Sequence, residues 1–480
     1  MTANPDAAAR RLKRTVQDPV RFARTFLGLD LWPTQEAILR SVAEHPRTAV
    51  KACHASSKTF TAAAALPWWI TCFPDGVVIT TAPTWHQVER VLWQQVRQMA
   101  QETTLVTYPI PRKTELRLDP SRYAIGLSTD EAVRFQGFHG HILVIIDEAP
   151  GVRSEIWEAI EGIRAGGDVH VLALGNPTDP SGPFADAWGV QAASWHAFTI
   201  SAFDTPNLAG LGREDLLALE DDALDHNVRP YLVTRRWVRE KWEEWGQHGS
   251  PLWEARVLGQ FPVQTNEALY PLAWLEQAKI RVRPDAGTQP IEAGLDVAGP
   301  GEAETVVAIR QGSNLLALQA WPGADPIEAV VSFLAPWQRR ITTVRVDEVG
   351  LGYHFALDLR KRGFPVEGVN VGKPARNPER FLNLKAEIAW GFRERLEKGD
   401  CTGLSDEQAI AQFAGLHYAH DARGRIVVES KESLRKRGLP SPDRVDAILL
   451  AFAGRSRTRL LTPTRPDPGA IFAGIWDKKF

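Results

Sequence analysis

The chain has 480 residues, a length that predicts two or three domains rather than a single core. Apolar residues make up 44% and charged residues 24%, as in globular proteins, and the lack of an uncharged apolar run of about 18 residues excludes a membrane-spanning helix. The N-terminus lacks the apolar stretch of a secretory signal, and three widely spaced cysteines form neither a disulfide framework nor a zinc pattern. We therefore expect a protein of the reducing cytoplasm.

The formal net charge of −2 argues against a simple nucleic-acid coat protein, but the charges are unevenly distributed. Residues 1–270 carry 26 Lys and Arg against 32 Asp and Glu, whereas residues 271–480 carry 30 against 26. The C-terminal part is thus the basic one, and some of its acids are candidates for catalysis.

Along the N-terminal half, apolar strands alternate with helices. Residues 1–20 are expected to form a charged, frayed leader, and a helical pattern follows from Phe22 to Ala43, interrupted at Leu31-Trp32-Pro33. We predict helices over 58–70 and 84–100, with strands over 47–52, 76–83, 141–149 and 169–177. Continuous apolar strands separated by helices predict a mostly parallel sheet that helices cover.

The chain changes character after residue 203. Residues 204–270 are rich in Trp, Glu and Arg and are expected to be helical. Beyond them we predict three consecutive strands, then a helix, a strand, a helix and a short strand; the strands cover 291–299, 304–312, 314–321, 342–350 and 366–371, with a hairpin at Gly312-Ser313. Consecutive strands followed by alternation predict a mixed sheet.

These shifts divide the chain into five predicted segments. They are 1–20, 21–203, 204–270, 271–460 and 461–480, the last a Pro-rich, extended tail. Tryptophans at helical spacing could suggest base stacking, but we interpret them as packing residues: Trp68, Trp69, Trp85, Trp93, Trp237, Trp242, Trp245 and Trp253.

A phosphate-binding loop is predicted where the strand 47–52 meets the next helix. The sequence there is Ala52-Cys53-His54-Ala55-Ser56-Ser57-Lys58-Thr59, and Ala52 and Ser57 replace the glycines of the usual pattern G-x-x-x-x-G-K-[ST]. A buried strand, a loop of small residues and a helix start aim backbone N–H groups at phosphates. Lys58 would then contact the β- and γ-phosphates of ATP and Thr59 would ligate Mg²⁺. An ordinary strand-to-helix turn with a surface lysine is the alternative.

An acid pair favours the nucleotide interpretation. Asp147 and Glu148 end an apolar strand, where a carboxylate is costly unless it binds a metal or a partner. Asp147 suits Mg²⁺, and Glu148 suits the base that orients the attacking water. Asn176, at the tip of the next strand, is a candidate γ-phosphate sensor or part of a plain turn, and the amide of Gln35 is a candidate for reading adenine. The order of loop and acid pair is that of a P-loop ATPase.

Acids in the C-terminal half are candidates for a divalent metal site. Asp296 lies inside an apolar strand, and Asp347 ends another, followed by Glu348, which could equally point away. Asp443 begins a helix, where it could instead be a cap, and Asp446 lies on the same helix face. Acids from two strands and a late helix can converge on two ions for phosphodiester hydrolysis.

Together these segments resemble the large terminase subunit of tailed bacteriophages. In chain order the matching segments are LWPTQEAIL, KACHASSKT, VVITTAPTWHQV, FQGFHGHILVIIDEA, LALGNP, SPLWEARVLGQFP, GLDVAG, VRVDEVGLG, NLKAE and SPDRVDAILLAF. The resemblance covers roughly residues 20–455. Each segment alone is a modest match, and the order of all the segments together makes the resemblance specific. It implies an N-terminal P-loop ATPase domain with a mostly parallel sheet, joined to a C-terminal nuclease domain of RNase H-like fold with a mixed sheet. Ser57 departs from the family, whose members usually keep Gly before the lysine.

The resemblance also implies a ligand set for the nuclease. Asp296, Asp347 and Asp443 are the implied metal ligands, with Asp446 or Glu304 as a fourth. Lys385 and Glu387 are implied to serve the same site, with packing or a helical ion pair as the alternative. In a ring motor an arginine finger is expected, for which Arg134 is the candidate in trans and Lys51 in cis; a surface position is the alternative for both.

Basic residues flank the proposed metal site and are candidates for contacts with DNA phosphates. A solvated charged face is the alternative for all of them: Lys431, Arg435, Lys436, Arg437 and Arg444.

The implied function is ATP-driven translocation of double-stranded DNA into a procapsid and Mg²⁺- or Mn²⁺-dependent endonucleolytic cleavage of concatemeric viral DNA. The implied partners are the portal protein, a small terminase subunit and further copies of the chain in a ring, a pentamer by analogy, at the portal vertex in the host cytoplasm. No membrane partner is expected. Two other hypotheses stay open: a helicase–nuclease of DNA repair, and a non-hydrolysing docking protein, which the missing glycines suggest.

Overall fold

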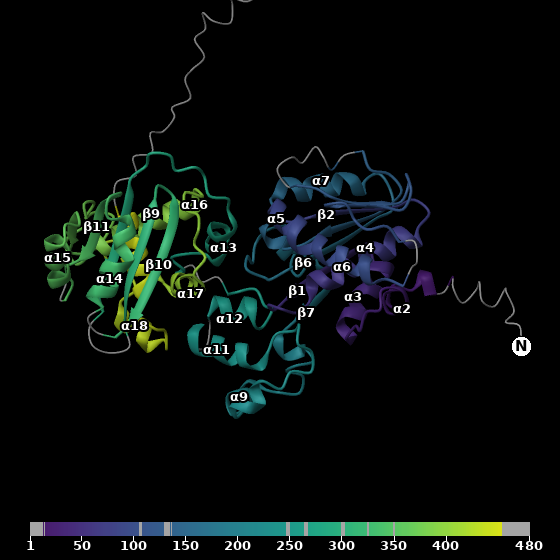
Figure 1. Cartoon of the computed structure of the whole chain (residues 1–480), viewed down its shortest axis with the longest axis horizontal. Helices are drawn as coiled ribbons and strands as arrows, with labels where there is room; N and C mark the ends of the chain where they lie inside the picture. Colours follow the sequence, from purple (N-terminus) through teal and green to yellow (C-terminus); the bar gives the residue numbers. More distant parts are fainter. Residues whose placement is uncertain are drawn as a thin grey trace, which may run out of the picture.

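Figure 1 shows a computed structural model of the chain. The structure describes residues 13, 15–104, 108–128, 135, 137–245, 250–263, 267–298, 303–323, 326–348 and 351–453. The predicted tail 461–480 and most of the predicted leader 1–20 lie outside these residues. Of the helices that the structure describes, none is both long enough and apolar enough to span a membrane.

The described part of the N-terminal half folds around a seven-stranded sheet. Its strands are β1 (Arg47–Ala52), β2 (Gly76–Thr81), β3 (Glu115–Arg117), β4 (Tyr123–Gly126), β5 (His141–Ile146), β6 (Val169–Gly175) and β7 (His196–Ile200). They follow the order β3-β4-β2-β5-β6-β1-β7, and only the β3–β4 pair among them is antiparallel. The predicted, mostly parallel sheet is therefore confirmed.

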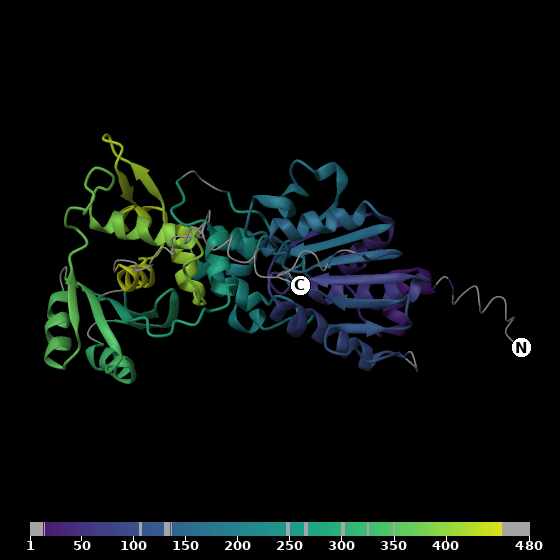
Figure 2. The ribbon, with the colours of Figure 1, turned by 90° about the horizontal axis from the view of Figure 1, so that it is seen from above.

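Helices cover both faces of this sheet (Figure 2). Along β5, Leu143 and Ile145 belong to one hydrophobic core, whereas Ile142, Val144 and Ile146 belong to the other. The first core is closed by α2 (Pro19–Phe26), α3 (Pro33–Glu44), α4 (Lys58–Cys72) and α6 (Trp93–Glu102), and the second by α7 (Ser154–Arg164) and α8 (Gly182–Asp186). The helix predicted over 84–100 is interrupted: a short α5 (Trp85–Gln87) and a π-helical turn (Val88–Leu92) precede α6.

Short helices connect the two sheets. They are α9 (Arg213–Leu217), α10 (Asp221–Leu224), α11 (Arg235–Trp245), α12 (Pro251–Arg256) and α13 (Leu272–Ile280). The rings of Trp242 and Trp253 meet edge to face at 4.8 Å, and both are buried. The interpretation of the tryptophans as packing residues thus holds for the buried ones, which are Trp68, Trp69, Trp93, Trp242, Trp245 and Trp253, whereas Trp85 is exposed.

The described C-terminal half contains a five-stranded mixed sheet. Its strands are β8 (Ile291–Asp296), β9 (Glu304–Gln311), β10 (Asn314–Pro322), β11 (Ile341–Asp347) and β12 (Val366–Val369), in the order β10-β9-β8-β11-β12. The β10–β9 and β9–β8 pairs are antiparallel, and the β8–β11 and β11–β12 pairs are parallel. The predicted mixed sheet is confirmed. Around it lie α14 (Ile327–Leu334), α15 (Gly352–Lys361), α16 (Leu384–Glu397), α17 (Glu407–Gly415), α18 (Lys431–Lys436), α19 (Asp443–Phe452) and a hairpin of β13 (Tyr418–His420) and β14 (Ile426–Val428).

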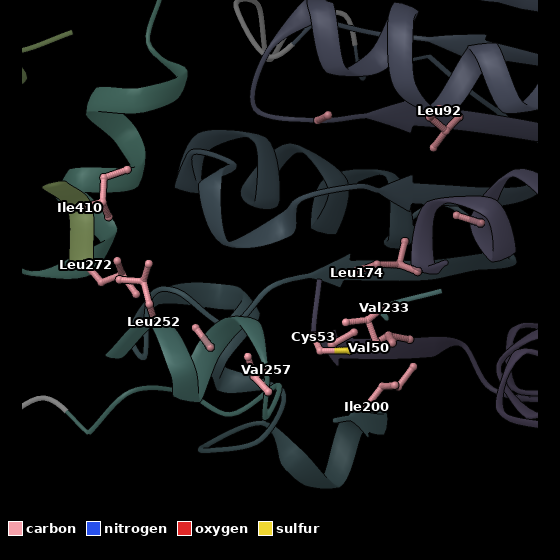
Figure 3. Packing of buried hydrophobic residues seen from close by; sticks show 14 of the residues in the cluster. Val50, Cys53, Leu92, Leu174, Ile200, Val233, Leu252, Val257, Leu272 and Ile410 are labelled. Atoms are coloured by element: carbon pink, nitrogen blue, oxygen red, sulfur yellow. The ribbon is translucent and has the colours of Figure 1, made fainter. Parts of the chain in front are cut away.

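A continuous hydrophobic cluster joins the two halves (Figure 3). It runs from Val50 and Cys53 beside the predicted phosphate loop, through Leu252 and Val257, to Ile410 of α17. Because these side chains are almost fully buried, the helices between the sheets are packed rather than loosely tethered.

A buried ion-pair cluster lies in the same contact. The guanidinium of Arg256, a residue 2% exposed, pairs with Glu276 of α13 and with Glu407 of α17, and Lys279 also pairs with Glu407. The carbonyl oxygen of Arg256 accepts a hydrogen bond from His54 N–H at 2.8 Å. Arg256 therefore connects the predicted phosphate loop to a helix of the C-terminal half.

Candidate active sites

The predicted phosphate loop lies at the edge of the first sheet where the parallel strands end. Cys53 N–H donates to the carbonyl of Ile200 at 2.8 Å, and Ala55 accepts a hydrogen bond from Val233 N–H at 3.0 Å. With the bond between His54 and Arg256, three neighbouring segments hold the loop. This edge of a parallel sheet is the usual ligand-binding edge of α/β proteins.

Two residues of the loop adopt the left-handed backbone conformation that favours glycine. Ala55 has φ of 48° and Ser57 has φ of 60°. Ser57 stands at the second glycine position of the usual pattern, so the loop keeps a glycine-like conformation without the glycine. Ala52, at the first glycine position, ends β1 and is not among the residues with positive φ.

Lys58 is buried between two polar side chains at the start of α4. Its Nζ lies 3.2 Å from Asn176 Oδ1 and 3.2 Å from Glu148 Oε1. Burial lowers the pKa of Lys58, but the carboxylates of Glu148 and Asp147 outweigh burial and raise it above its ordinary value. Lys58 is therefore a fixed positive charge at the predicted γ-phosphate position.

Thr59 and Asp147 are hydrogen-bonded to each other. Thr59 Oγ1 donates to Asp147 Oδ2 at 3.0 Å. Burial, with the charge of Glu148, raises the pKa of Asp147 to about 6. The hydroxyl of Thr59 and the buried carboxylate of Asp147 are adjacent oxygen ligands of the kind that Mg²⁺ prefers.

Glu148 and Asn176 complete this group from two different loops. Glu148 has φ of 48°, an unfavourable conformation for a residue with a Cβ. Asn176 donates through Nδ2 to the carbonyl of Ala52 at 2.6 Å, which presents its Oδ1 to Lys58. Glu148 and Asn176 also line a cavity of about 280 Å³ that reaches His54, Arg256 and α13.

A larger cavity of about 840 Å³ lies over the phosphate loop. It is lined by residues 55–60, by residues of α6, by the segments 28–30 and 228–232, and by Gln35, whose Oε1 accepts a hydrogen bond from Trp32 N–H at 3.1 Å. Ser56 also lines it, and its buried Oγ has no hydrogen-bond partner among the described residues. A cavity of this size with an unpaired hydroxyl in its wall fits a nucleotide.

The other residues predicted for this site have different surroundings. Burial raises the pKa of the Cys53 thiol to about 12, and burial with the charge of Arg256 holds the pKa of His54 well below its usual range. Lys51 donates to Gln260 Oε1 at 2.7 Å. Arg134 lies outside the described residues.

The four predicted acids of the C-terminal half come from three elements that meet at one place. Asp296 ends β8, Asp347 ends β11, and Asp443 and Asp446 lie in the first turn of α19. Asp443 does not cap its helix, because Pro442 occupies the cap position. Asp296, Asp347 and Asp446 line a cavity of about 320 Å³, together with Lys385 and Lys431.

The ammonium group of Lys431 lies among these acids. Its Nζ is 3.1 Å from Asp443 Oδ1, 3.2 Å from Asp446 Oδ2 and 3.8 Å from Asp296 Oδ2. Lys385 Nζ lies 3.0 Å from Asp446 Oδ1. The sequence predicted Lys431 as a DNA contact that flanks the metal site, and the structure places its ammonium among the acids.

The charges in this cluster shift one another's pKa values. Burial and the neighbouring Asp446 raise the pKa of Asp296 to about 8, despite the opposite influence of Lys431. The pKa of Lys431 is lowered by burial but raised by more through Asp296, Asp446 and Asp443. Over the described residues, no three Asp, Glu, His or Cys side chains are arranged as ligands of one ion. The carboxylates instead surround the ammonium of Lys431, and their oxygen atoms are ligands of the kind that a divalent cation prefers.

Three other acids point elsewhere. Glu304 accepts two hydrogen bonds from Arg444, at 2.9 and 3.0 Å. Glu348 lies against Gly368 of β12, with Arg360 at 3.8 Å. Glu387 accepts a hydrogen bond from the backbone N–H of Arg376 at 2.6 Å. The carboxylates of these three acids therefore bond to other groups, although the backbone N–H of Glu304 donates to Asp443 Oδ2 at 2.9 Å.

The predicted DNA-contacting residues differ in their surroundings. Arg435 and Lys436 are exposed on α18. Arg437 pairs with Glu429 at 2.6 Å, and Arg444 is held by Glu304 and by Asp406 at 2.7 Å. Lys436 pairs with the exposed Glu432 at 2.9 Å, whereas Arg437 and Arg444 are held by less exposed acids, so Arg435 and Lys436 are the more accessible candidates.

The chain matches no family model. It is 28% identical, over 336 residues, to the probable large terminase subunit of Enterobacteria phage P7. The predicted resemblance to large terminase subunits is therefore confirmed. The match covers 65% of this chain and 63% of the P7 terminase, so the chain spans less than two thirds of that relative.

Among solved structures, the large terminase of bacteriophage HK97 overlaps 88% of this chain and 95% of its own, at 14% identity and a TM-score of 0.36. A variant nuclease domain of the large terminase of bacterial virus Sf6, solved with manganese, overlaps 38% of this chain and 98% of its own, at 16% identity and a TM-score of 0.32.

Proposed function

We propose that the chain is a phage large terminase subunit that hydrolyses ATP at the first site and cleaves DNA at the second. The observation that carries this proposal is the arrangement of Lys58, Thr59, Asp147 and Glu148 at the strand ends of a parallel sheet. A positive charge, a hydroxyl–carboxylate pair and a second carboxylate are the groups that phosphoryl transfer to water requires. The 28% sequence identity to the P7 terminase supports the same function.

In the proposed ATPase, ATP is the substrate and occupies the cavity over the phosphate loop. The ammonium of Lys58 balances charge on the β- and γ-phosphates, and Glu148 accepts a proton from the attacking water and orients it. Thr59 and Asp147 hold Mg²⁺, which supplies charge stabilisation at the phosphates. Asn176, already bonded to Lys58, contacts the γ-phosphate, and Arg134 is the proposed finger from a neighbouring subunit.

In the proposed nuclease, Asp296, Asp347, Asp443 and Asp446 hold divalent ions, Mg²⁺ or Mn²⁺, which supply a nucleophilic water and stabilise the leaving oxygen. The exposed Arg435 and Lys436 bind the backbone of double-stranded DNA near this cavity. The proposed domains are an ATPase core over 21–203, a helical subdomain over 204–270 and a nuclease domain over 271–460.

The proposed assembly is a ring of subunits, a pentamer, docked on the portal protein of a procapsid in the host cytoplasm. There the ring translocates double-stranded DNA, and a small terminase subunit directs cleavage of the concatemer. These partners follow from the resemblance to large terminases.

The test uses the full chain in two assays. With Mn²⁺, the wild type should relax and linearise plasmid DNA, and Asp296→Ala should abolish cutting, whereas retained cutting would remove Asp296 from the site. With ATP, the chain should leave a labelled duplex with a single-stranded tail intact. Strand separation would instead favour a helicase–nuclease of DNA repair.

A further inference from the structure

The segment 228–233 borders the cavity over the phosphate loop. Both ends of this segment are bonded to other parts of the chain. Val233 N–H donates to the carbonyl of Ala55 in the phosphate loop at 3.0 Å. At the other end, Arg229 donates to the carbonyl of Asp30 at 2.7 Å and pairs with its carboxylate at 2.9 Å. Residues 228–232 and 28–30 both line the cavity. The segment therefore joins the phosphate loop to the segment 28–30, and all three line the same cavity.

A buried amide holds the backbone of this segment in shape. Asn207, which is fully buried, donates through Nδ2 to the carbonyls of Arg229 at 2.8 Å and Val233 at 3.0 Å. Its Oδ1 accepts a hydrogen bond from Arg229 N–H at 2.8 Å. Asn207 Nδ2 also donates to the carbonyl of Leu232 at 3.4 Å. Four hydrogen bonds to one buried side chain thus hold the backbone of the loop in place.

Tyr231 lies on the solvent-exposed side of this loop. It is 87% exposed and lines the cavity. A large aromatic side chain held in water on a rigid loop at the mouth of a cavity is an arrangement that binds the face of another ring system. The cavity wall also contains Trp32 and Gln35, and the amide of Gln35 is a polar group suited to the edge of a base.

We propose that Tyr231 stacks on the base of the bound nucleotide and makes this site prefer purine nucleoside triphosphates. The inference rests on the proposed function, because it takes ATP as the substrate. Stacking adds affinity through the base and leaves the phosphates to Lys58 and Thr59. The larger purine ring system overlaps a tyrosine ring over more area than a pyrimidine does, so ATP binds more tightly than CTP.

The test measures dissociation constants by calorimetry for ATP, CTP and inorganic tripolyphosphate with the full chain. Tyr231→Ala should weaken ATP binding about 5- to 100-fold, leave tripolyphosphate binding unchanged and reduce the preference for ATP over CTP. Tyr231→Phe should keep wild-type affinity. In turnover assays Tyr231→Ala should raise KM for ATP and keep kcat. Tyr353→Ala, at an exposed tyrosine of α15, is the matched control and should change nothing.

The outcomes separate this inference from the function on which it rests. A wild type that binds neither ATP nor tripolyphosphate overturns both. A wild type that binds and hydrolyses ATP, with Tyr231→Ala unchanged in affinity, overturns only the stacking role. Equal losses of ATP and tripolyphosphate affinity would show that the substitution disturbs the loop rather than the base, and would also overturn the inference.

Discussion

Gly294 of β8 and Ala447 of α19 lie so close together that a Cβ atom on Gly294 would overlap the carbonyl oxygen of Ala447. The same Cβ would overlap the backbone nitrogen of Ala451. This close approach brings the end of β8, which carries Asp296, against the helix that carries Asp443 and Asp446. The absence of one side chain thus allows the acids of the proposed nuclease to converge.

Gly294→Ala should therefore separate β8 from α19. Because backbone atoms rather than a flexible side chain fill the space, we expect a loss of at least about 1–3 kcal/mol in the free energy of unfolding and a large loss of Mn²⁺-dependent plasmid cleavage. Thermal melting and the cleavage assay measure these effects. Gly391→Ala, in α16, is the control: a Cβ there meets nothing within 4 Å, so stability should stay equal or rise. If the two variants behaved alike, the close approach would not matter.

Replacing the buried Asp296 should stabilise the metal-free protein in a pH-dependent way. Its carboxyl pKa is raised from 3.8 to about 8, so between these values the folded chain holds a proton that the unfolded chain has released. The stability contributed by this group is present below 3.8 and is lost as the pH rises through about 8.

Asp296→Asn in EDTA should accordingly melt at a higher temperature than the wild type, with a gap that widens from pH 5 to pH 8. Calorimetric melting at both pH values measures it, and each 1 kcal/mol corresponds to about 2–4 °C. Asp285→Asn, at an exposed position, should leave the melting temperature unchanged. A constant gap across this pH range would contradict the raised pKa of Asp296.

Ser57→Gly should relieve strain in the phosphate loop. Ser57 has φ of 60°, which costs a residue with a Cβ roughly 1–2 kcal/mol and costs glycine nothing. We expect a gain of up to about 1 kcal/mol in stability, with ATP affinity retained. Ala52→Gly is the matched control at the other missing glycine: it lies in β1 and should lose about 1 kcal/mol. A destabilised Ser57→Gly variant that no longer binds ATP would contradict this account of the loop.

The elements with local apolar patterns could be predicted from the sequence. The predicted strand 47–52 coincides with β1, in which every residue after Arg47 is buried. The edge strand β7 was missed because it is largely exposed and lacks an apolar pattern, and the hairpin strands β13 and β14 because they have three residues each.

Individual site residues could be proposed from strand ends, but their neighbours could not. Asp147 and Asp296 stand out because a carboxylate in an apolar strand is costly. The position of Lys431 among the acids depends on how α18 packs beside α19, and that of Tyr231 on a loop framed by Asn207. Both relationships depend on how separate elements pack, so spacing in the sequence does not give the distances between these side chains.

The pair of Arg256 and Glu407 should hold the two halves together. Arg256 is the buried partner of Glu276 and Glu407. Because Glu407 is 36% exposed and stays paired with Lys279, Arg256→Met should cost about 1–3 kcal/mol of stability. The double variant with Glu407→Leu should lose less than the two single losses combined. Arg360→Met, which removes an exposed pair with Glu348 at 3.8 Å, should cost no more than about 1 kcal/mol. Equal costs for Arg256→Met and Arg360→Met in thermal melting would contradict a structural role for the buried pair.

The central claim is that Glu148 activates water for ATP hydrolysis while Lys58 and Thr59 bind the nucleotide. The most direct measurement is single-turnover ATP hydrolysis by the full chain, with portal and procapsid present, beside the ATP dissociation constant of the same sample. The account predicts that Glu148→Gln binds ATP about as tightly as the wild type and hydrolyses it at least about 100-fold more slowly. A wild type as inactive as Glu148→Gln, or a Glu148→Gln variant that hydrolyses ATP at the wild-type rate, would contradict it.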